Sequence, residues 1–296
     1  MILPILGGPT GSGKTALTKV LDPKRFEIVS FDSRQVYRDL PVGTTAPTHE
    51  ESSHIRHWLV GFLNADESIN ASQFSLWARE AIKDITARGK IPFLIGGTGF
   101  YLRAFLMGMY PVPNVPKETK DFVLELPLEK AREELYAKDP KALESLSPQD
   151  GYRIKRALEV VLTGVLWSEV SKETVGGYLN DYPDVQVIGH WLDWPRDILY
   201  ERINHRVEEI ATGMLAETKE VVSKYGSNCP GLRTLGYNFA LAFLNGIIDS
   251  NTFIEQLAQS HRNYAKRQIT WFKKDPLLSP ISFEAAVQLY TNIDKI

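Results

Sequence analysis

One stretch of the sequence decides how this chain folds: Gly8-Pro9-Thr10-Gly11-Ser12-Gly13-Lys14-Thr15. It has the spacing G-x-x-x-x-G-K-[ST] of a phosphate-binding loop. The loop follows the apolar run Ile2–Leu6 and opens the helix-favouring stretch Lys14–Leu21. Backbone N–H groups and the helix N-terminus favour an anion there. We expect Lys14 to neutralise phosphate oxygens and the Thr15 hydroxyl to hold a bridging Mg²⁺. The motif predicts polyphosphate binding and leaves open which polyphosphate is bound.

Outside the loop, short apolar runs alternate with helical patterns. The runs Ile2–Leu6, Glu27–Phe31 and Ile91–Ile95 have the length of buried strands. Between the last two, Gln73–Arg88 has helical periodicity and stops at Gly89. Its predicted apolar face consists of Phe74, Trp77, Ala78, Ala81, Ile82 and Ile85. Alternating strands and helices predict an α/β fold, with a P-loop NTPase-like core of parallel sheet and flanking helices.

The pattern changes near Tyr110, where three prolines interrupt regular structure. The following segment reads as helical and highly charged, and strand-like sequence returns at Val185–Ile188. From Pro195 the sequence is helical almost to its end. We therefore expect a catalytic core of residues 1–110 and 184–296, interrupted by a smaller helical insertion domain of residues 111–183.

Composition points to an ordinary globular protein. The 296 residues are 43% hydrophobic and 24% charged, and no apolar run reaches the ~18 residues of a membrane span. The single cysteine, Cys229, cannot form an internal disulfide, which fits a reduced compartment. The net charge of -2 hides basic clusters at Arg153–Arg156 and Arg262–Lys274. We expect a cytoplasmic protein with no membrane partner and no obligate protein partner, for which a monomer is adequate.

A carboxylate follows the second predicted strand. Asp32 comes directly after Glu27–Phe31, whereas the third strand leads into Gly96-Gly97-Thr98 without an acid. Ligands of open α/β sheets bind at the carboxyl ends of the strands. Both a metal-linked role and a general-base role are open to Asp32 at this point.

Several motifs, read together, resemble the bacterial type of the tRNA dimethylallyltransferases, also called tRNA isopentenyltransferases. They span almost the whole chain in the family's order. Besides the phosphate-binding loop, they are Ser30-Phe31-Asp32-Ser33-Arg34-Gln35-Val36-Tyr37, Gly43-Thr44, Gly96-Gly97-Thr98-Gly99-Phe100-Tyr101, Arg153-Ile154-Lys155-Arg156-Ala157-Leu158-Glu159-Val160, Gly236-Tyr237 and Tyr264-Ala265-Lys266-Arg267-Gln268-Ile269-Thr270-Trp271-Phe272.

The resemblance implies a reaction. Dimethylallyl diphosphate donates its prenyl group to the exocyclic amine of the tRNA adenosine just 3′ of the anticodon, and diphosphate leaves. The phosphate-binding loop then holds the donor's diphosphate. Lys14, Thr15 and Mg²⁺ stabilise the leaving charge, Arg206 lies near the diphosphate, and Asp32 is the base that accepts the amine proton.

The resemblance also implies where tRNA binds. Ser33, Arg34, Gln35 and Val36, together with Asp32, are expected to contact the extruded nucleotide and its neighbours, and Thr98 to touch the tRNA and the reacting pocket. The insertion is expected to grip the anticodon stem through Tyr152, Arg153, Lys155 and Arg156, because cations bind phosphates and an aromatic ring can stack.

The chain departs from the family pattern in a few places. Gly43-Thr44-Thr45-Ala46-Pro47 lacks the family's lysine, Val165 stands where a lysine is common, and the segment between Thr119 and Glu133 is short. The spacing of His49, His54 and His57 gives only a weak case for a metal site, and we expect a mobile loop near the active site there.

Three alternatives stay open from sequence. One is prenyl transfer to free AMP, ADP or ATP, which uses the same loop and aspartate. Another is a small-molecule kinase with ATP on the loop. The last is a non-catalytic module that binds RNA or senses nucleotides, whose binding would be indifferent to Asp32.

Overall fold

The computed structural model describes residues 1–293 and divides into two compact units. One unit comprises Met1–Phe105 and the chain from Tyr182 onward, and the other comprises Leu106–Asp181. The sequence had placed the two boundaries at 110/111 and 183/184. Within residues 1–293 no helix is long and apolar enough to cross a membrane.

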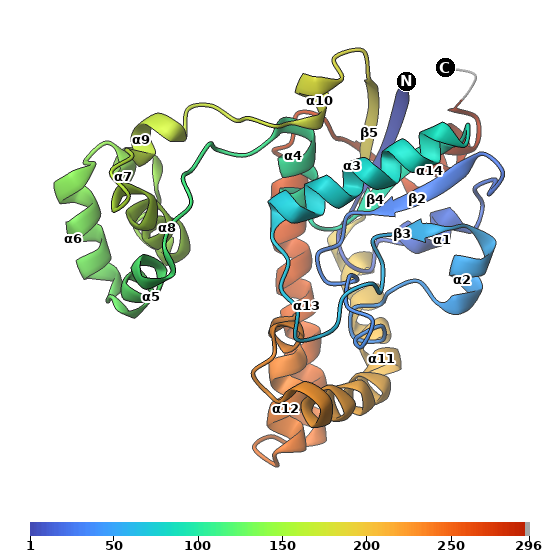
Figure 1. The fold of residues 1–296 in the computed structure, drawn as a ribbon. Coiled ribbons are helices and arrows are strands. Elements are labelled where there is room, and N and C mark those ends of the chain that lie inside the picture. The colour runs from blue at the N-terminus through green and yellow to red at the C-terminus, as the bar shows by residue number, and fades with distance from the viewer. Residues whose placement is uncertain (294–296) are drawn as a thin grey trace. The chain divides into compact units, whose positions relative to one another are not determined.

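A six-stranded sheet in the order β3-β2-β4-β1-β5-β6 forms the centre of the first unit (Figure 1). Its strands are β1 Ile2–Gly7, β2 Phe26–Ser30, β3 His57–Trp58, β4 Ile91–Gly96, β5 Gln186–Leu192 and β6 Ser279–Ile281. Every pair of neighbours is parallel, which confirms the predicted parallel sheet with flanking helices. The edge strands β3 and β6 were not predicted, because two or three residues are too short to show an alternating pattern. His57 therefore lies in a strand paired with β2, not in a free loop.

The first unit also contains helices, several of which flank this sheet. They are α1 Lys14–Thr18, α2 His49–His54, α3 Ala71–Ala87, α4 Gly99–Met107, α11 Arg196–Tyr225, α12 Tyr237–Leu244, α13 Ser250–Phe272 and α14 Phe283–Thr291, with a short 3-10 helix at Pro230–Arg233. Helix α3 begins at the capping box of Asn70 and Gln73 and ends before Gly89, whose φ is 73°. Trp77 was wrongly placed on its buried face: the side chain is 37% exposed and meets Phe62 edge-on at 5.0 Å.

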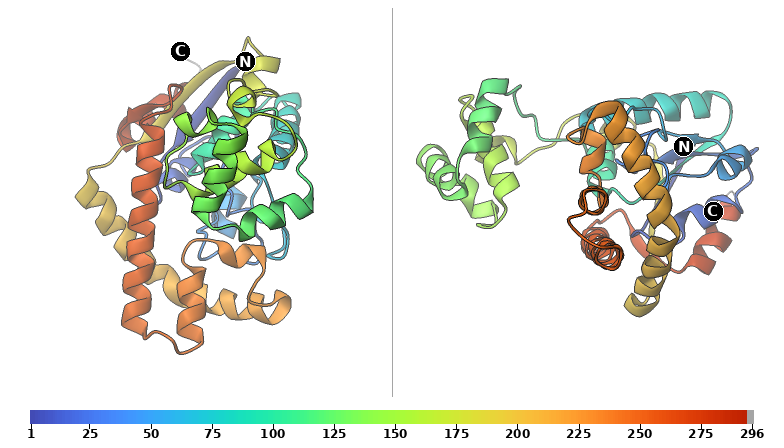
Figure 2. Two further views of the ribbon diagram at one scale, coloured as in Figure 1. Left: turned by 90° about the vertical axis from the view of Figure 1, so that its left-hand side faces the viewer. Right: turned by 90° about the horizontal axis from the view of Figure 1, so that it is seen from below.

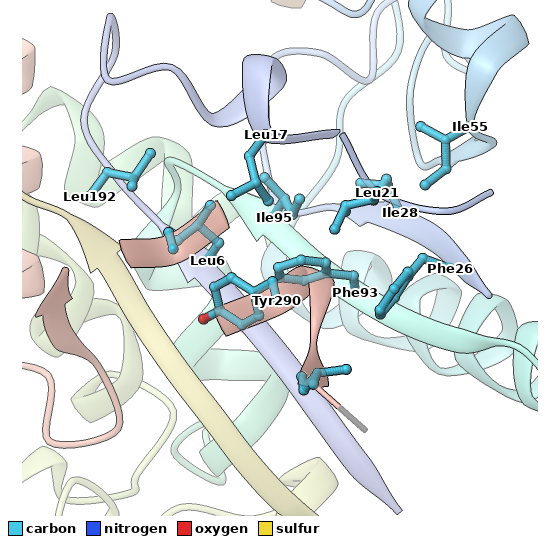
Figure 3. Close-up of a cluster of buried hydrophobic side chains, with 12 residues drawn as sticks. Leu6, Leu17, Leu21, Phe26, Ile28, Ile55, Phe93, Ile95, Leu192 and Tyr290 are labelled. Atoms are coloured by element: carbon cyan, nitrogen blue, oxygen red, sulfur yellow. The ribbon is translucent and has the colours of Figure 1, made fainter. Parts of the chain in front are cut away.

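The core beneath the phosphate-binding loop is built around Tyr290 of α14 (Figure 3). Its ring lies 4.6 Å from that of Phe93 on β4, and its hydroxyl donates to the Ile5 carbonyl of β1 at 2.7 Å. Leu6 at the end of β1 and Leu17 of α1 belong to the same cluster. The strand and helix on either side of the loop are thus fixed by one packed core.

Three helices of the first unit, α11, α12 and α13, pack against one another (Figure 2). Glycines at the carboxyl edge of the sheet leave room for α13. A Cβ on Gly7 would lie 2.6 Å from the Phe272 ring, and one on Gly99 would lie 2.1 Å from the Trp271 ring. Trp271 and Phe272 of α13 are therefore packing residues at the sheet edge.

The second unit has a core of its own. It contains α5 Lys117–Glu125, α6 Leu128–Lys138, α7 Ala142–Ser145, α8 Gly151–Val161, α9 Trp167–Val170 and α10 Tyr178–Asp181. The apolar residues of α8 fall at helical spacing, with Ile154, Leu158 and Val161 on the inner side. They pack against Leu135 of α6 and Trp167 of α9.

Candidate functional site

A cavity of about 880 Å³ lies in the first unit, where the chain leaves β1 and β2. This is the sheet edge at which α/β proteins bind ligands. The chain segments that line it are the phosphate-binding loop, the turn after β2, the loop after Leu40, the first half of α11, the segment just before α12 and one face of α13. The lining residues are Thr10, Gly11, Ser12, Gly13, Lys14, Thr15, Asp32, Ser33, Arg34, Gln35, Gly43, Thr44, Thr45, Glu201, Arg202, His205, Arg206, Glu209, Arg233, Thr234, Leu235, His261, Tyr264, Arg267 and Gln268.

The phosphate-binding loop has the conformation that its glycines allow. Gly11 and Gly13 have φ of 78° and 93°, which side-chain-bearing residues rarely adopt. Lys14 Nζ donates to the carbonyls of Gly8 and Pro9 at 2.8 and 2.9 Å. Burial lowers the pKa of Lys14 to about 8, against the opposing attraction of Asp32. The ammonium is thus held over the loop, where it can meet an anion.

Three distant side chains brace the loop from behind. Trp194 donates its indole N–H to the Ser12 carbonyl at 2.9 Å, and Arg202 donates Nε–H to the Gly11 carbonyl at 2.8 Å. The Thr10 N–H donates to Gln268 Oε1 at 2.9 Å. Gln268 also donates from Nε2 to the Gly97 carbonyl at 2.8 Å. Gln268 therefore ties the loop to the end of β4.

Arg206 is the cation of α11 that remains available in the cavity. Arg202 donates a hydrogen bond to the Gly11 carbonyl, and its guanidinium carbon lies over the Trp194 ring, 4.7 Å from the centroid. Arg206 makes no hydrogen bond or ion pair with the described part of the chain. Burial lowers its pKa, and the negative charge of Asp32 opposes that effect. Its guanidinium is therefore a half-buried donor with no protein acceptor among the described residues, and it lines the same cavity as Lys14.

Asp32 lies between these cations and the turn after β2. Its Oδ1 accepts the N–H groups of Arg34 and Gln35 at 2.9 and 3.4 Å. Its Oδ2 has no hydrogen-bond partner within residues 1–293. The carboxylate is thus oriented by the turn and keeps one oxygen for a ligand. Its electrostatic coupling to both Lys14 and Arg206 places it beside the anion site.

The glycine-rich segment after β4 comes close to this turn. A Cβ on Gly96 would lie 2.1 Å from the Phe31 carbonyl oxygen, so only glycine fits there. Thr98 accepts the Ser33 N–H at 3.1 Å through its hydroxyl. Thr98 does not line the cavity itself, but it holds Ser33, which does.

The residues predicted to contact the extruded nucleotide divide into two groups. Ser33, Arg34 and Gln35 line the cavity together with Asp32. Val36 does not: its side chain is fully buried, and its carbonyl accepts from Phe62 and Leu63. The expectation that Val36 contacts RNA is therefore wrong for its side chain, which is part of the core beneath the turn.

Glu217 joins two motifs that the sequence showed only as separate fragments. It accepts the N–H groups of Val42 and Gly43 at 2.9 and 2.6 Å and the hydroxyl proton of Tyr237. Burial raises the pKa of Glu217, while these donors oppose the rise. A Cβ on Gly43 would lie 2.4 Å from the Tyr237 hydroxyl. Sequence reasoning missed Glu217, because one acid on a charged helix carries no signal.

Other lining residues that sequence reasoning missed come from the helical C-terminal part. Arg233, Thr234 and Leu235 precede the Gly236-Tyr237 motif. His261 lies one turn before the α13 motif, and Tyr264 is the first residue of that motif. His261 is 6% exposed, and burial, helped by Arg206, lowers its pKa to about 4. Their position next to the quoted motifs was the available signal.

In the second unit, the four residues predicted to bind RNA differ in whether their side chains already have partners within the protein. Tyr152 is 81% exposed. Arg153 forms a 3.5 Å ion pair with Asp150. Lys155 donates to the Leu124 carbonyl at 2.7 Å, and Arg156 pairs with Glu159 at 2.6 Å. The exposed end of α8 therefore presents Tyr152 and Arg153.

The described residues contain no group of three or more His, Cys, Asp or Glu side chains that could hold a metal ion. The hypothesis of a metal site at His49, His54 and His57 therefore has no support among the described residues. Mg²⁺ has a different requirement, since it takes one or two protein oxygens and otherwise water and substrate phosphates. Thr15 at the start of α1 lines the cavity beside Lys14 and fits that donor set.

Comparisons with known proteins show what the whole chain is similar to. A model of the IPP transferase family matches residues 35–275. The tRNA dimethylallyltransferase of Leptospira biflexa serovar Patoc is 82% identical over 295 residues, with 100% of both chains covered. That of Leptospira interrogans is 46% identical over 290 residues and 98% of each chain.

Solved structures extend the comparison. The tRNA delta(2)-isopentenylpyrophosphate transferase of Staphylococcus epidermidis has a TM-score of 0.68 and 30% identity, with 99% of each chain covered. A eukaryotic dimethylallyltransferase acting on tRNA has a TM-score of 0.77 and 25% identity, over 99% of this chain and 77% of that chain.

Proposed function

Since the chain belongs to the IPP transferase family and transfers a dimethylallyl group to tRNA, we propose how its residues perform that transfer. The donor is dimethylallyl diphosphate and the acceptor is the exocyclic amine of the adenosine next to the anticodon on its 3′ side. The observation that carries the proposal is that an anion loop and a carboxylate with a free oxygen share one cavity.

The diphosphate lies in the loop of Gly8–Thr15. Backbone N–H groups and the N-terminus of α1 face it, and Lys14 leaves the carbonyls of Gly8 and Pro9 to meet its oxygens. Arg206 supplies a second cation that has no protein partner to give up. Thr15 would hold Mg²⁺, which would supply further charge neutralisation to the diphosphate. These groups favour the transition state because negative charge grows on the leaving oxygen as the C–O bond breaks.

The acceptor amine faces Asp32. The amine is a weak nucleophile because its lone pair is delocalised into the ring. As the new N–C bond forms, the nitrogen becomes acidic, and Oδ2 of Asp32 takes its proton. One C–O bond breaks, one N–C bond forms, the proton goes to the carboxylate, and diphosphate leaves. The target lies in a loop of RNA, so its extrusion into the cavity costs little pairing energy.

The second unit supplies the grip on the anticodon stem in this proposal. Tyr152 and Arg153 are its exposed contact groups, for stacking and for a phosphate. Lys155 and Arg156 reach RNA only by releasing Leu124 and Glu159.

The test is transfer of radiolabel from dimethylallyl diphosphate, with Mg²⁺, to unmodified tRNA and separately to AMP, ADP and ATP. We expect label on tRNA, and a loss of about 10²- to 10⁴-fold in Asp32→Asn. The exposed Asp66→Asn is the matched control and keeps full activity. Label on free nucleotides alone would assign the chain to the adenylate-prenylating class. Turnover of ATP without any label would assign it to the kinases.

A further inference from the structure

One face of helix α4, which begins shortly after β4, exposes an aromatic ring and a cation (Figure 1). Phe100 is 57% exposed, and Arg103, three residues later, is exposed as well. Residues three apart lie on one side of a helix, with Cβ atoms about 5–6 Å apart. The neighbouring residues Leu102, Ala104 and Phe105 are buried. The reaction described above gives neither exposed side chain a role.

Helix α4 begins at the rim of the cavity. The hydroxyl of Thr98 accepts the Ser33 N–H at 3.1 Å, and Ser33 lines the cavity. The Thr98 carbonyl accepts the N–H of Tyr101 at 3.0 Å, so the first turn of the helix starts from the same residue. Phe100 follows Thr98 by two residues, so the two Cα atoms lie within about 8 Å of each other. The exposed ring is therefore close to the part of the cavity wall that Ser33 forms.

The helix is a fixed support for this ring. On its inner side, the Phe105 ring lies 5.2 Å from that of Phe31, and the Tyr101 ring lies 5.2 Å from that of Phe74. Phe100 itself meets Tyr101 edge-on, with the ring centroids 6.1 Å apart. A planar ligand that stacks on Phe100 therefore meets a preorganised surface, which lowers the entropy cost of binding.

The two exposed side chains offer complementary contacts. Arg103 makes no hydrogen bond, ion pair or ring contact within residues 1–293, so its charge is available to an anion. An aromatic face stacks with a nucleic acid base of any sequence, and a cation beside it binds the phosphate. The spacing of Phe100 and Arg103 suits the base and the phosphate of one nucleotide. A base inside the cavity is covalently linked to its neighbours in the strand, which therefore lie at the rim.

We propose that the exposed face of α4 binds the nucleotide adjacent to the target in the RNA strand, with its base stacked on Phe100 and its phosphate on Arg103. The inference rests on the proposed function and adds a contact surface for the same acceptor. The contact fixes the strand beside the cavity and takes no part in making or breaking bonds. It therefore contributes to the affinity for RNA and not to the binding of the donor.

The experiment measures the Kd of an unmodified anticodon stem-loop RNA by fluorescence anisotropy. We expect Phe100→Ala to raise the Kd about tenfold, whereas Phe100→Tyr, which keeps a stacking face, stays within about twofold of wild type. Arg103→Ala should reduce the slope of log Kd against log salt by about 0.7, the value for one phosphate of a single strand. The controls are Ile247→Ala, which removes another exposed apolar side chain, and Lys83→Ala, which removes an exposed cation of α3; both should bind as wild type.

A second series of RNAs identifies the stacked base. In each RNA an abasic site replaces the nucleotide on the 5′ or the 3′ side of the target. We expect wild-type enzyme to lose about tenfold in affinity with one of the two, and Phe100→Ala to lose nothing further with that RNA. The rate of prenyl transfer at saturating RNA, the KM for dimethylallyl diphosphate and the Tm should stay as in wild type, because Phe100 is exposed and lies outside the donor site.

Three results would overturn the inference while leaving the proposed function intact. One is a Phe100→Ala enzyme that binds the stem-loop as tightly as wild type. Another is a Phe100→Ala enzyme that still loses about tenfold with the abasic RNA. The third is an altered oligomeric state of Phe100→Ala with unchanged RNA affinity, which would assign this face to a second copy of the chain. If the wild-type enzyme transfers no label to any RNA, the proposed function itself fails.

Discussion

Replacing Gln268 by alanine removes the brace between the phosphate-binding loop and the end of β4. Gln268 is 6% exposed, and its amide satisfies the Thr10 N–H and the Gly97 carbonyl at 2.9 and 2.8 Å. Each buried backbone group left without a partner costs about 1–3 kcal/mol. Two such groups lower the free energy of unfolding by about 2–4 kcal/mol, because the site relaxes in part. For a protein of this size that corresponds to a fall in Tm of about 4–8 °C.

Thermal and urea unfolding of Gln268→Ala measure the loss directly, and the KM for dimethylallyl diphosphate reports on the loop. We expect the KM to rise about tenfold, because Thr10 belongs to the anion site. Gln259→Ala, on the exposed side of the same helix, is the control and stays within about 0.5 kcal/mol.

A second substitution tests the cause. A Cβ on Gly97 would lie 2.5 Å from Gln268 Nε2, so Gly97→Ala alone displaces the amide. In the double variant that Cβ enters the space Gln268 has vacated. The double variant should therefore lose about 1–2 kcal/mol less than the sum of the single losses. Strictly additive losses, or a Gln268→Ala protein as stable as wild type, would refute the reasoning.

Three further predictions follow from the same geometry. Because burial lowers the pKa of Lys14 to about 8, its positive charge is present below pH 8 and is lost above it. The KM for the donor should therefore rise between pH 8 and 9.5 in the wild type and stay constant in Lys14→Arg, which keeps its charge. A flat wild-type profile would contradict this. Glu217→Ala leaves the N–H groups of Val42 and Gly43 unpaired and should lower the free energy of unfolding, measured by urea titration, by about 2–5 kcal/mol. The exposed Glu220→Ala is the control and should show no change, and equal stability of the two variants would show that Glu217 does not stabilise this loop. Arg153→Ala should weaken tRNA binding and reduce the slope of log Kd against log salt by about one, and an unchanged slope would mean that Arg153 meets no phosphate.

The sheet and the anion site were predictable because their signals are local. The octapeptide Gly8–Thr15 fixes a strand, a turn and a helix within a few residues, and apolar runs at regular intervals give the parallel strands. Asp32 was found by the same logic, since it directly follows a predicted strand. The edge strands escaped because β6 is only three residues long and is defined by its partner β5.

What the sequence did not reveal are the contacts between distant segments. Val36 looked like part of a binding motif, but its side chain is fully buried in the core. Glu217 looked like one acid among many, yet it is the acceptor that holds the loop at Gly43. Such roles depend on tertiary neighbours, which periodicity and spacing do not encode.

One helix connects the two halves of the reaction. In the proposed mechanism Gln268 of α13 supports the loop that holds the donor, and Tyr264, one turn earlier, lines the same cavity. Phe272 and Trp271, one turn later, seat the helix on Gly7 and Gly99 at the sheet edge. Any shift of α13 therefore moves the support of the loop and this wall of the cavity together. The glycines that let α13 come so close thus keep the distance between diphosphate and base constant, which matters because a small misplacement of the reacting atoms costs about 10²-fold in rate.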